Sequence, residues 1–406
     1  MSMILPKEAW QTNMICYKTI AGQIFPIGSI GKSDLRLRVQ NTTEEECREY
    51  ALLLEQSGYC KHTEKQISAG SKYPYNINLY YEYQNDKNNI FIFWDSAIHT
   101  VFITVEPLSA LPTKELVSKN EACGLPTFTQ LQLQRSGMSY IVQLESGEFI
   151  VVDGGKYEEK ACLHLYEFLK ENSLNGLPCV ALWIFTHSHD DHISLATKFL
   201  NEYKDKVTIK AFAYQFPDCD KIEVAMESVS KMKGEIADFE QAIEKCYPNA
   251  TVYTLHTGQS YFYDGVEIEV LYSLDDTYPH AYLSFNDTSS ALRMKFENEK
   301  TVLLLGDCMN EACKKMAHTY GDYLKSDILQ VSHHGLIGGD RGAYELIDPE
   351  ICFWPVAEER FLGKTPNQRY QWCLGEGGCD YNAYLRDDSI RKRTHYHQGV
   401  TTTIKL

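Results

Sequence analysis

Potential metal ligands are concentrated in residues 186–192. This segment reads Thr-His-Ser-His-Asp-Asp-His, so three histidines and two aspartates fall within six consecutive positions. Imidazole nitrogens and carboxylate oxygens are the usual donors to divalent transition metals. His187 and His189, two positions apart, can point the same way from an extended segment, and Asp191 and His192 can then reach a second ion. The spacing favours a metal site over the alternative, a solvated loop that happens to contain histidines.

The residues around this cluster predict how it is held. Residues 180–185 form an apolar run typical of a fully buried strand, and residues 193–203 place Leu195, Phe199 and Leu200 at helical spacing. The cluster therefore lies on a strand-to-helix loop, where a rigid sheet can hold its side chains in place.

Two later apolar runs also end in potential ligands. Residues 303–305 precede Gly306 and Asp307, and residues 328–331 precede Ser332 and the pair His333-His334. Both runs are predicted to be buried strands. Asp307 has an alternative role as the N-cap of a helix predicted at 309–319, because aspartate is favoured there.

The order of these motifs resembles that of the metallo-β-lactamase superfamily. The resemblance covers roughly residues 125–406 and includes an upstream strand at 150–152 followed by Asp153-Gly154-Gly155. Residues 285–292 point to a subgroup within this superfamily. Their sequence, Phe-Asn-Asp-Thr-Ser-Ser-Ala-Leu, is similar to the hydrolase-like domain of bacterial competence DNA-channel proteins and to choline-phosphate esterases. The resemblance implies an αββα sandwich and hydrolase activity.

The resemblance also implies a ligand set. A first ion is expected at His187 and His189, a second at Asp191, His192 and one of the paired histidines, with a bridging carboxylate at Asp307. His334 is preferred as that ligand because it precedes Gly335, so His333 would face the cleft and contact an oxyanion or a phosphate. The reverse assignment stays open.

Asn286 stands where most of the superfamily has a histidine. Its side chain is a weaker, neutral ligand, and it is also suited to donate a hydrogen bond to an oxyanion. His256 and His280 are the alternatives that could replace the missing histidine. Asp153 is expected to orient a ligating histidine rather than touch the metal.

This ligand set predicts a metal-dependent hydrolase. Two ions that share a water lower its pKa toward about 7 and supply hydroxide at neutral pH, with Asp191 or a bound water protonating the leaving group. Two zinc ions in a dinuclear site fit these donors best, and manganese or iron fit next. The expected substrate is a small molecule or phosphoester, cleaved at an ester or phosphodiester bond. Alternatives are carbon–nitrogen or thioester hydrolysis, and a metal-holding interaction module with little turnover.

Composition limits the partners. The 406 residues carry a net charge of −16, which argues against a nucleic-acid footprint, and no apolar run approaches the ~18 residues of a membrane span. Thirteen cysteines without framework spacing, including the pairs 308/313 and 373/379, are expected to be free thiols in the cytoplasm. Residues 391–393 (Arg-Lys-Arg), beside His395 and His397, form either a solvated turn or a patch that steers phosphate.

The chain is predicted to divide near residue 120. A small α+β module over residues 1–118 contains a capping box at Thr43 to Glu46, a helix to residue 55, and strands at 76–83, 90–94 and 100–105. Residues 125–406 alternate strands and helices, as expected for an α/β (α+β) sandwich. Its predicted strands are 139–144, 149–152, 207–214, 251–254, 265–272, 290–296 and 301–305, and its predicted helices are 156–170, 193–203, 221–245 and 309–319.

Overall fold

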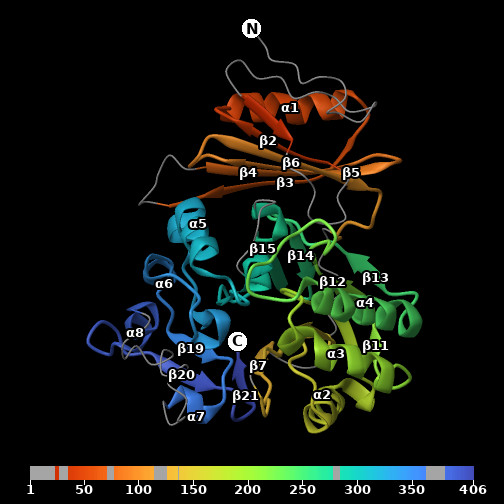
Figure 1. Ribbon diagram of the computed structural model, residues 1–406, viewed down its shortest axis with the longest axis vertical. Coiled ribbons are helices and arrows are strands. Elements are labelled where there is room, and N and C mark those ends of the chain that lie inside the picture. Colours follow the sequence, from red (N-terminus) through yellow and green to blue (C-terminus); the bar gives the residue numbers. More distant parts are fainter. Residues whose placement is uncertain are drawn as a thin grey trace.

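Two β-sheets pack face to face over the part of the chain that follows residue 126 (Figure 1). The computed structural model describes residues 23–26, 35–70, 77–113, 126–135, 137–277, 284–362 and 380–406. The first sheet has the order β13-β12-β10-β9-β8-β7-β21, with β11 beside β10. Its strands are β7 Thr127–Gln130, β8 Tyr140–Gln143, β9 Phe149–Val152, β10 Cys179–Ile184, β11 Thr208–Ile209, β12 Ala211–Ala213, β13 Thr251–Tyr253 and β21 Thr402–Lys405.

The second sheet has the order β14-β15-β16-β17-β18-β19-β20. Its strands are β14 Ser260–Tyr263, β15 Val266–Tyr272, β16 Ala291–Phe296, β17 Thr301–Leu304, β18 Ile328–Gln330, β19 Ile351–Trp354 and β20 Thr394–His397. In both sheets the strands that precede the chemically important segments run parallel to a neighbour, so their carboxyl ends meet at one edge.

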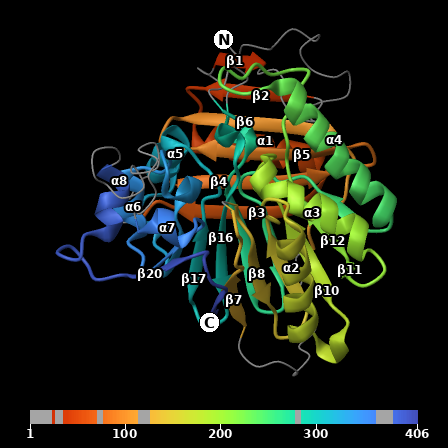
Figure 2. The same cartoon turned by 60° about the horizontal axis from the view of Figure 1, so that its bottom comes forward.

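Helices cover the outer face of each sheet. The first sheet packs against α2 Glu159–Asn172, α3 Asp190–Tyr203 and α4 Val229–Cys246, and the second against α5 Asn310–Tyr320, α6 Arg341–Ile347 and α8 Asp380–Arg386. The short helix α7 Glu358–Phe361 follows β19. Figure 2 shows the strands between the two groups of helices. This arrangement confirms the predicted αββα sandwich.

Alternation along the strands builds these layers. In β9 and β10, Val151 and Trp183 face the helices, whereas Ile150 and Leu182 face the second sheet, because successive side chains of a strand point to opposite faces. All four are buried on their own side, which explains why these strands read as continuous apolar runs.

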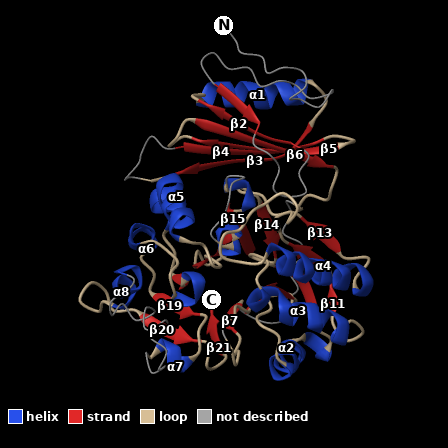
Figure 3. Ribbon diagram, viewed as in Figure 1, coloured by secondary structure: helices blue, strands red, loops and turns tan. Residues whose placement is uncertain are grey.

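A third, antiparallel sheet with the order β1-β2-β6-β5-β4-β3 lies above the sandwich, with α1 on its outer face (Figure 3). Its elements are β1 Gln23–Pro26, β2 Leu35–Gln40, α1 Glu44–Gln56, β3 Cys60–Ser68, β4 Ile77–Gln84, β5 Asn88–Asp95 and β6 Thr100–Pro107. The predicted capping box is present, with Thr43 and Glu46 satisfying each other's backbone N–H. We refer to this sheet and α1 as the N-terminal module. The boundary at 118–125 remains a prediction, because residues 114–125 lie outside the described residues.

The N-terminal module rests on the second sheet of the sandwich. Tyr81 faces α1, whereas its neighbour Tyr80 faces the sandwich and bonds the hydroxyl of Tyr320 at 2.9 Å. Asn78 donates to the carbonyl of Thr319 at 2.7 Å. The dense tyrosines of this region therefore serve packing on both faces. Tyr73 and Tyr75 lie outside the described residues.

Three sequence expectations are corrected. The helix predicted at 221–245 begins at Val229, because Ser228 caps it by accepting from the N–H of Lys231. The spacing of Ile222, Met226, Val229 and Met232 predicts an apolar stripe on that helix, but Met226 precedes the helix and is 72% exposed. The strand predicted at 207–214 is divided into β11 and β12. Among the described residues, no helix combines the length and apolar character needed to cross a membrane.

Candidate metal centre

The sequence motifs converge at the carboxyl ends of β10, β17 and β18. The loop after β10 carries His187 and His189 and leads into the first turn of α3, Asp307 follows β17, and His334 follows β18. These side chains form two potential ligand groups, each with its ligand atoms within 4.8 Å of one another. The groups are His187, His189 and Asp307, and Asp191, His192 and His334.

Asp307 links the two groups. Its Oδ2 lies 3.3 Å from His192 Nε2, 3.4 Å from His334 Nε2 and 3.8 Å from His187 Nε2. It does not cap α5, whose N-cap is Met309. A carboxylate placed between the histidines of both groups has the geometry required of a bridging ligand.

Buried hydrogen bonds fix two of the histidines by their remote nitrogens. His192 Nδ1 donates to Asp153 Oδ2 at 2.8 Å, and His187 Nδ1 donates to Thr186 Oγ1 at 3.1 Å. Thr186 Oγ1 in turn donates to Asp153 Oδ2 at 2.8 Å. Asp153 thus orients the imidazole of His192 directly and that of His187 through Thr186, and both Nε2 atoms face Asp307.

The other two histidines, His334 and His189, are also oriented by a hydrogen bond from one ring nitrogen. His334 Nδ1 donates to the carbonyl of Pro355 at 2.7 Å, and His189 Nε2 donates to Glu227 Oε2 at 2.6 Å. His189 therefore turns its Nδ1 inward, where it lies 3.0 Å from His187 Nε2. In all four rings a protein oxygen accepts a hydrogen bond from one nitrogen, so the other nitrogen points to the centre and can donate its lone pair.

The inward atoms have the properties of unfilled ligands. His192 Nε2 and Asp307 Oδ1 are buried and have no hydrogen bond in the described structure. Buried polar atoms without partners are uncommon and costly. A divalent cation between these donors would satisfy them, so the residues present fit a dinuclear metal centre.

The protonation of the site follows from burial and from its carboxylates. Burial opposes charge on Asp307, but His334 and His192 outweigh it and hold the pKa of the carboxyl well below its usual range. Burial also opposes protonation of His334, yet Asp307 and Asp191 raise its pKa to about 10. Burial and the neighbouring His192 keep the pKa of His187 well below its usual value. Without a cation, protons on the imidazoles balance the carboxylates.

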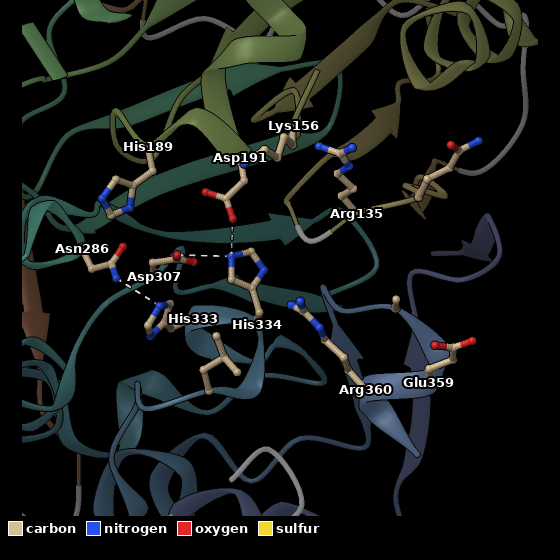
Figure 4. A pocket seen from close by; sticks show the side chains of 13 residues that line it. Arg135, Lys156, His189, Asp191, Asn286, Asp307, His333, His334, Glu359 and Arg360 are labelled. Atoms are coloured by element: carbon tan, nitrogen blue, oxygen red, sulfur yellow. Dashed lines mark hydrogen bonds and ion pairs between the residues drawn. The ribbon is translucent and has the colours of Figure 1, made fainter. Parts of the chain in front are cut away.

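Backbone geometry separates His333 from His334. Both residues adopt left-handed φ values, 47° and 57°, which sends their side chains in different directions. His334 joins Asp191 and His192, whereas His333 Nε2 accepts a hydrogen bond from Asn286 Nδ2 at 3.1 Å (Figure 4). The structure therefore brings His334, and not His333, together with Asp191 and His192.

Asn286 lies beside the first ligand group. Its amide nitrogen is engaged with His333, and its Oδ1 is buried without a hydrogen bond. Figure 4 shows this oxygen on the side of His189. This orientation suits a neutral metal ligand more than a hydrogen-bond donor to an oxyanion.

Other candidates lie away from the centre. His256 uses both ring nitrogens, with Nδ1 2.6 Å from Asp275 Oδ2 and Nε2 3.2 Å from Glu106 Oε2, so it is not a substitute ligand. Arg391 and Arg393 both pair with Asp348, which makes the basic run structural rather than a phosphate-steering patch. The thiols of Cys308 and Cys313 are free and buried. His280, Cys373 and Cys379 lie outside the described residues.

The centre opens into a cavity of about 710 Å³. Among the described lining residues only Leu336 and Ala357 are aliphatic, and none belongs to the N-terminal module. The polar and charged lining comprises Gln134, Arg135, Lys156, His189, Asp191, Asn286, Asp307, His333, His334, Glu359 and Arg360. The sequence motifs did not identify Arg135, Lys156 or Arg360, because each stands alone in a loop or short helix with no local pattern.

No family model matches this chain, and no curated protein matches it. Among solved structures, the metallo-beta-lactamase fold protein YhfI from Bacillus subtilis aligns with 69% of this chain and 99% of its own length, at 11% identity and a TM-score of 0.41. The short form of human tRNase Z aligns over 70% and 100%, at 11% identity and 0.37. CmlA, a diiron beta-hydroxylase from Streptomyces venezuelae, aligns over 74% and 55%, at 12% identity and 0.40. All three TM-scores are below 0.5.

Proposed function

We propose that this protein is a hydrolase of the metallo-β-lactamase superfamily that uses two divalent ions, with zinc as the first candidate, to cleave ester or phosphodiester bonds. The observation that carries the proposal is the position of Asp307 between two histidine-containing groups whose inward nitrogens are directed by buried acceptors. The preference for phosphodiesters rests on the sequence resemblance to the competence-protein and choline-phosphate esterase subgroup. The free cysteines support a cytoplasmic location as part of this proposal.

Each residue of the centre has a defined task in such a reaction. His187, His189 and Asp307 would hold the first ion, with Asn286 Oδ1 beside them, and Asp191, His192 and His334 would hold the second. Ions bound there supply Lewis acidity and lower the pKa of bound water toward about 7.

Asp191 and His333 also line the cavity, and their protonation limits the roles that each can have in the reaction. Although burial opposes its charge, Asp191 has a depressed pKa because of His334, so its carboxylate is charged at neutral pH and suits a cation more than proton donation to a leaving group. Burial lowers the pKa of His333, which stays neutral, and its bond to Asn286 holds the ring at the cavity. Because its Nε2 is engaged by Asn286 and its Nδ1 is buried, His333 positions the Asn286 amide and does not itself contact a substrate oxygen.

Metal analysis combined with a substrate panel tests the proposal. We expect about two ions per chain and turnover of bis(4-nitrophenyl) phosphate or a 4-nitrophenyl ester, with both reduced in Asp307→Ala. Asp327→Ala is a matched control, because this aspartate also flanks a strand of the second sheet but pairs with Lys300 on the surface.

The same panel separates the alternatives. Preferential turnover of a lactam or thioester would replace the phosphodiester assignment with carbon–nitrogen or thioester hydrolysis. Full metal loading without turnover of any member would contradict hydrolysis and favour a metal-holding interaction module. Loss of both ions and of activity in Asp327→Ala as well would show that the effect of Asp307→Ala is not specific to the centre.

A further inference from the structure

We propose that Arg135 and Arg360 form a second anion subsite in the cavity, which selects substrates that carry a phosphate or carboxylate group in addition to the bond that is cleaved. This inference rests on the proposed function, because it concerns the substrate of the same centre. It assigns a binding role to two residues that belong to neither ligand group.

The two arginines reach the cavity from different elements. Arg135 lies in the loop between β7 and β8, and Arg360 lies in α7 after β19. Figure 4 shows both on the same side of His334, away from His189 and Asn286. The Arg360 guanidinium points toward His334, whereas the neighbouring Glu359 carboxylate points away from it (Figure 4). One end of the cavity therefore carries the potential metal-binding side chains, and the other end carries the two arginines.

The charge of Arg135 remains usable by a bound anion. Arg135 pairs with Glu158 through its Nε, at 2.7 Å, and its side chain is 67% exposed. A guanidinium has five donors in a planar fork, so its terminal nitrogens still suit a carboxylate or phosphate. Lys156 also lines the cavity but is paired with Asp190 at 2.8 Å, so it adds less.

A single residue, Gln398, contacts the backbone of both segments that carry the arginines. Gln398 is 1% exposed, and its Nε2 donates to the carbonyl of Arg135 at 2.6 Å. Its backbone N–H donates to the carbonyl of Val356, just before α7, at 3.1 Å. One buried residue therefore fixes the backbone of Arg135 through its side chain and the backbone just before α7 through its own N–H, as expected of a built subsite and not of unrelated surface charges.

Size and net charge indicate the kind of ligand. A cavity of about 710 Å³ is within the range of small-molecule sites and exceeds what one phosphate requires. The net charge of −16 disfavours an extended polyanion, whereas two local arginines can hold a single anionic group at short range. The ligand expected is a small phosphoester with one further phosphate or carboxylate.

Calorimetry with a matched ligand pair tests the subsite directly. The probes are 3-phosphoglycerate and glycerol 3-phosphate, which are similar in size and differ by one carboxylate, each titrated into the zinc-loaded protein. We expect about tenfold tighter binding of 3-phosphoglycerate, and a preference reduced to about twofold in Arg135→Gln and in Arg360→Gln. Lys392→Gln, which removes one positive charge at an exposed position outside the described cavity lining, should keep the preference.

The outcomes distinguish the two proposals. Equal affinity of the unmodified protein for the two probes, or a preference that survives in both arginine variants, would overturn the subsite. A preference that depends on the arginines, in a protein that turns over neither phosphodiesters nor esters, would support the subsite and contradict the proposed reaction. Bis(4-nitrophenyl) phosphate lacks a second anionic group, so if it is hydrolysed its KM should change by no more than about twofold in Arg360→Gln.

Discussion

His189 depends on a residue that no local sequence pattern identifies. Its side chain is 17% exposed, whereas those of His187 and His192 are fully buried, so it is the least confined ring of the cluster. Glu227 compensates by accepting from His189 Nε2, and Ser284 Oγ donates to the other carboxylate oxygen. Glu227 lies 38 positions from His189 along the chain, in a segment predicted to be helical. The contiguous motif could be predicted from sequence, but this supporting contact could not.

Replacing Glu227 with glutamine should weaken the first ion selectively. The neutral amide is a poorer acceptor for the imidazole N–H, and loss of such a support typically costs about 10- to 100-fold in metal affinity. Competition titration with a zinc chelator should therefore show one weakened and one unchanged ion. Glu223→Gln, an exposed change in the same loop, is the control. Wild-type affinity for both ions in Glu227→Gln would show that the contact does not support the metal.

Metal binding should release protons, and affinity should therefore rise with pH. The pKa of His334 is about 10 in the metal-free protein, so this ring is protonated at neutral pH and must lose a proton to bind a cation. Each proton displaced makes apparent zinc affinity rise about tenfold per pH unit below that pKa. Calorimetry at pH 7 in buffers of different ionisation enthalpy counts the protons, and His334→Gln should release fewer. Binding that is independent of pH between 6 and 8 would contradict this protonation state.

At the scale of elements, the strand ends were predictable and the connections were not. The runs that became β10, β17 and β18 are mostly apolar, with Thr301 and Gln330 as buried polar exceptions, since both faces of each strand are buried, and potential ligands follow shortly after them. The apolar spacing of residues 222–232 predicted an earlier start of α4, but the helix begins only after the N-cap at Ser228. The exposed strand β3 was not predicted, because its alternation contains mostly polar residues that pair with β4.

The turn after β18 should tolerate no side chain at Gly335. Its φ is +73°, and an added Cβ would lie 2.5 Å from Cε3 of the Trp354 ring, which is fully buried. Gly335→Ala should cost about 1–3 kcal/mol in unfolding free energy and displace His334, leaving about one bound ion.

Gly234→Ala is the control for this prediction. Gly234 lies within α4, and no atom is within 4 Å of an added Cβ, so this change should leave metal content unaltered and increase stability by up to about 1 kcal/mol. Chemical denaturation and metal analysis of both variants provide the comparison. Two bound ions and unchanged stability in Gly335→Ala would refute the role of this turn.

At the scale of the whole molecule, the N-terminal module is joined to the sandwich by buried polar contacts. Glu106 of β6 and Phe91 of β5 meet His256 across the interface, and the Phe91 and His256 rings stack with centroids 3.6 Å apart. Lys65 of β3 pairs with Glu269 of β15. None of the described residues that line the cavity belongs to the module. Its docking surface was not predictable, because it joins residues more than 100 positions apart.

This interface should weaken in alkaline solution. Burial opposes protonation of His256, but Asp275 and Glu106 raise its pKa from 6.5 to about 10. A pKa raised on folding stabilises the folded protein fully below pH 6.5, and that contribution is lost as the pH rises through 10. The unfolding free energy of the zinc-loaded protein should therefore fall from pH 7 to pH 10, and His256→Gln should remove about 1–3 kcal/mol of that decline. Urea unfolding at both pH values measures it, with His164→Gln of α2, outside the interface, as the control. An equal decline in His256→Gln and in the unmodified protein would contradict a charged histidine at this junction, because the variant has no imidazole to lose its proton.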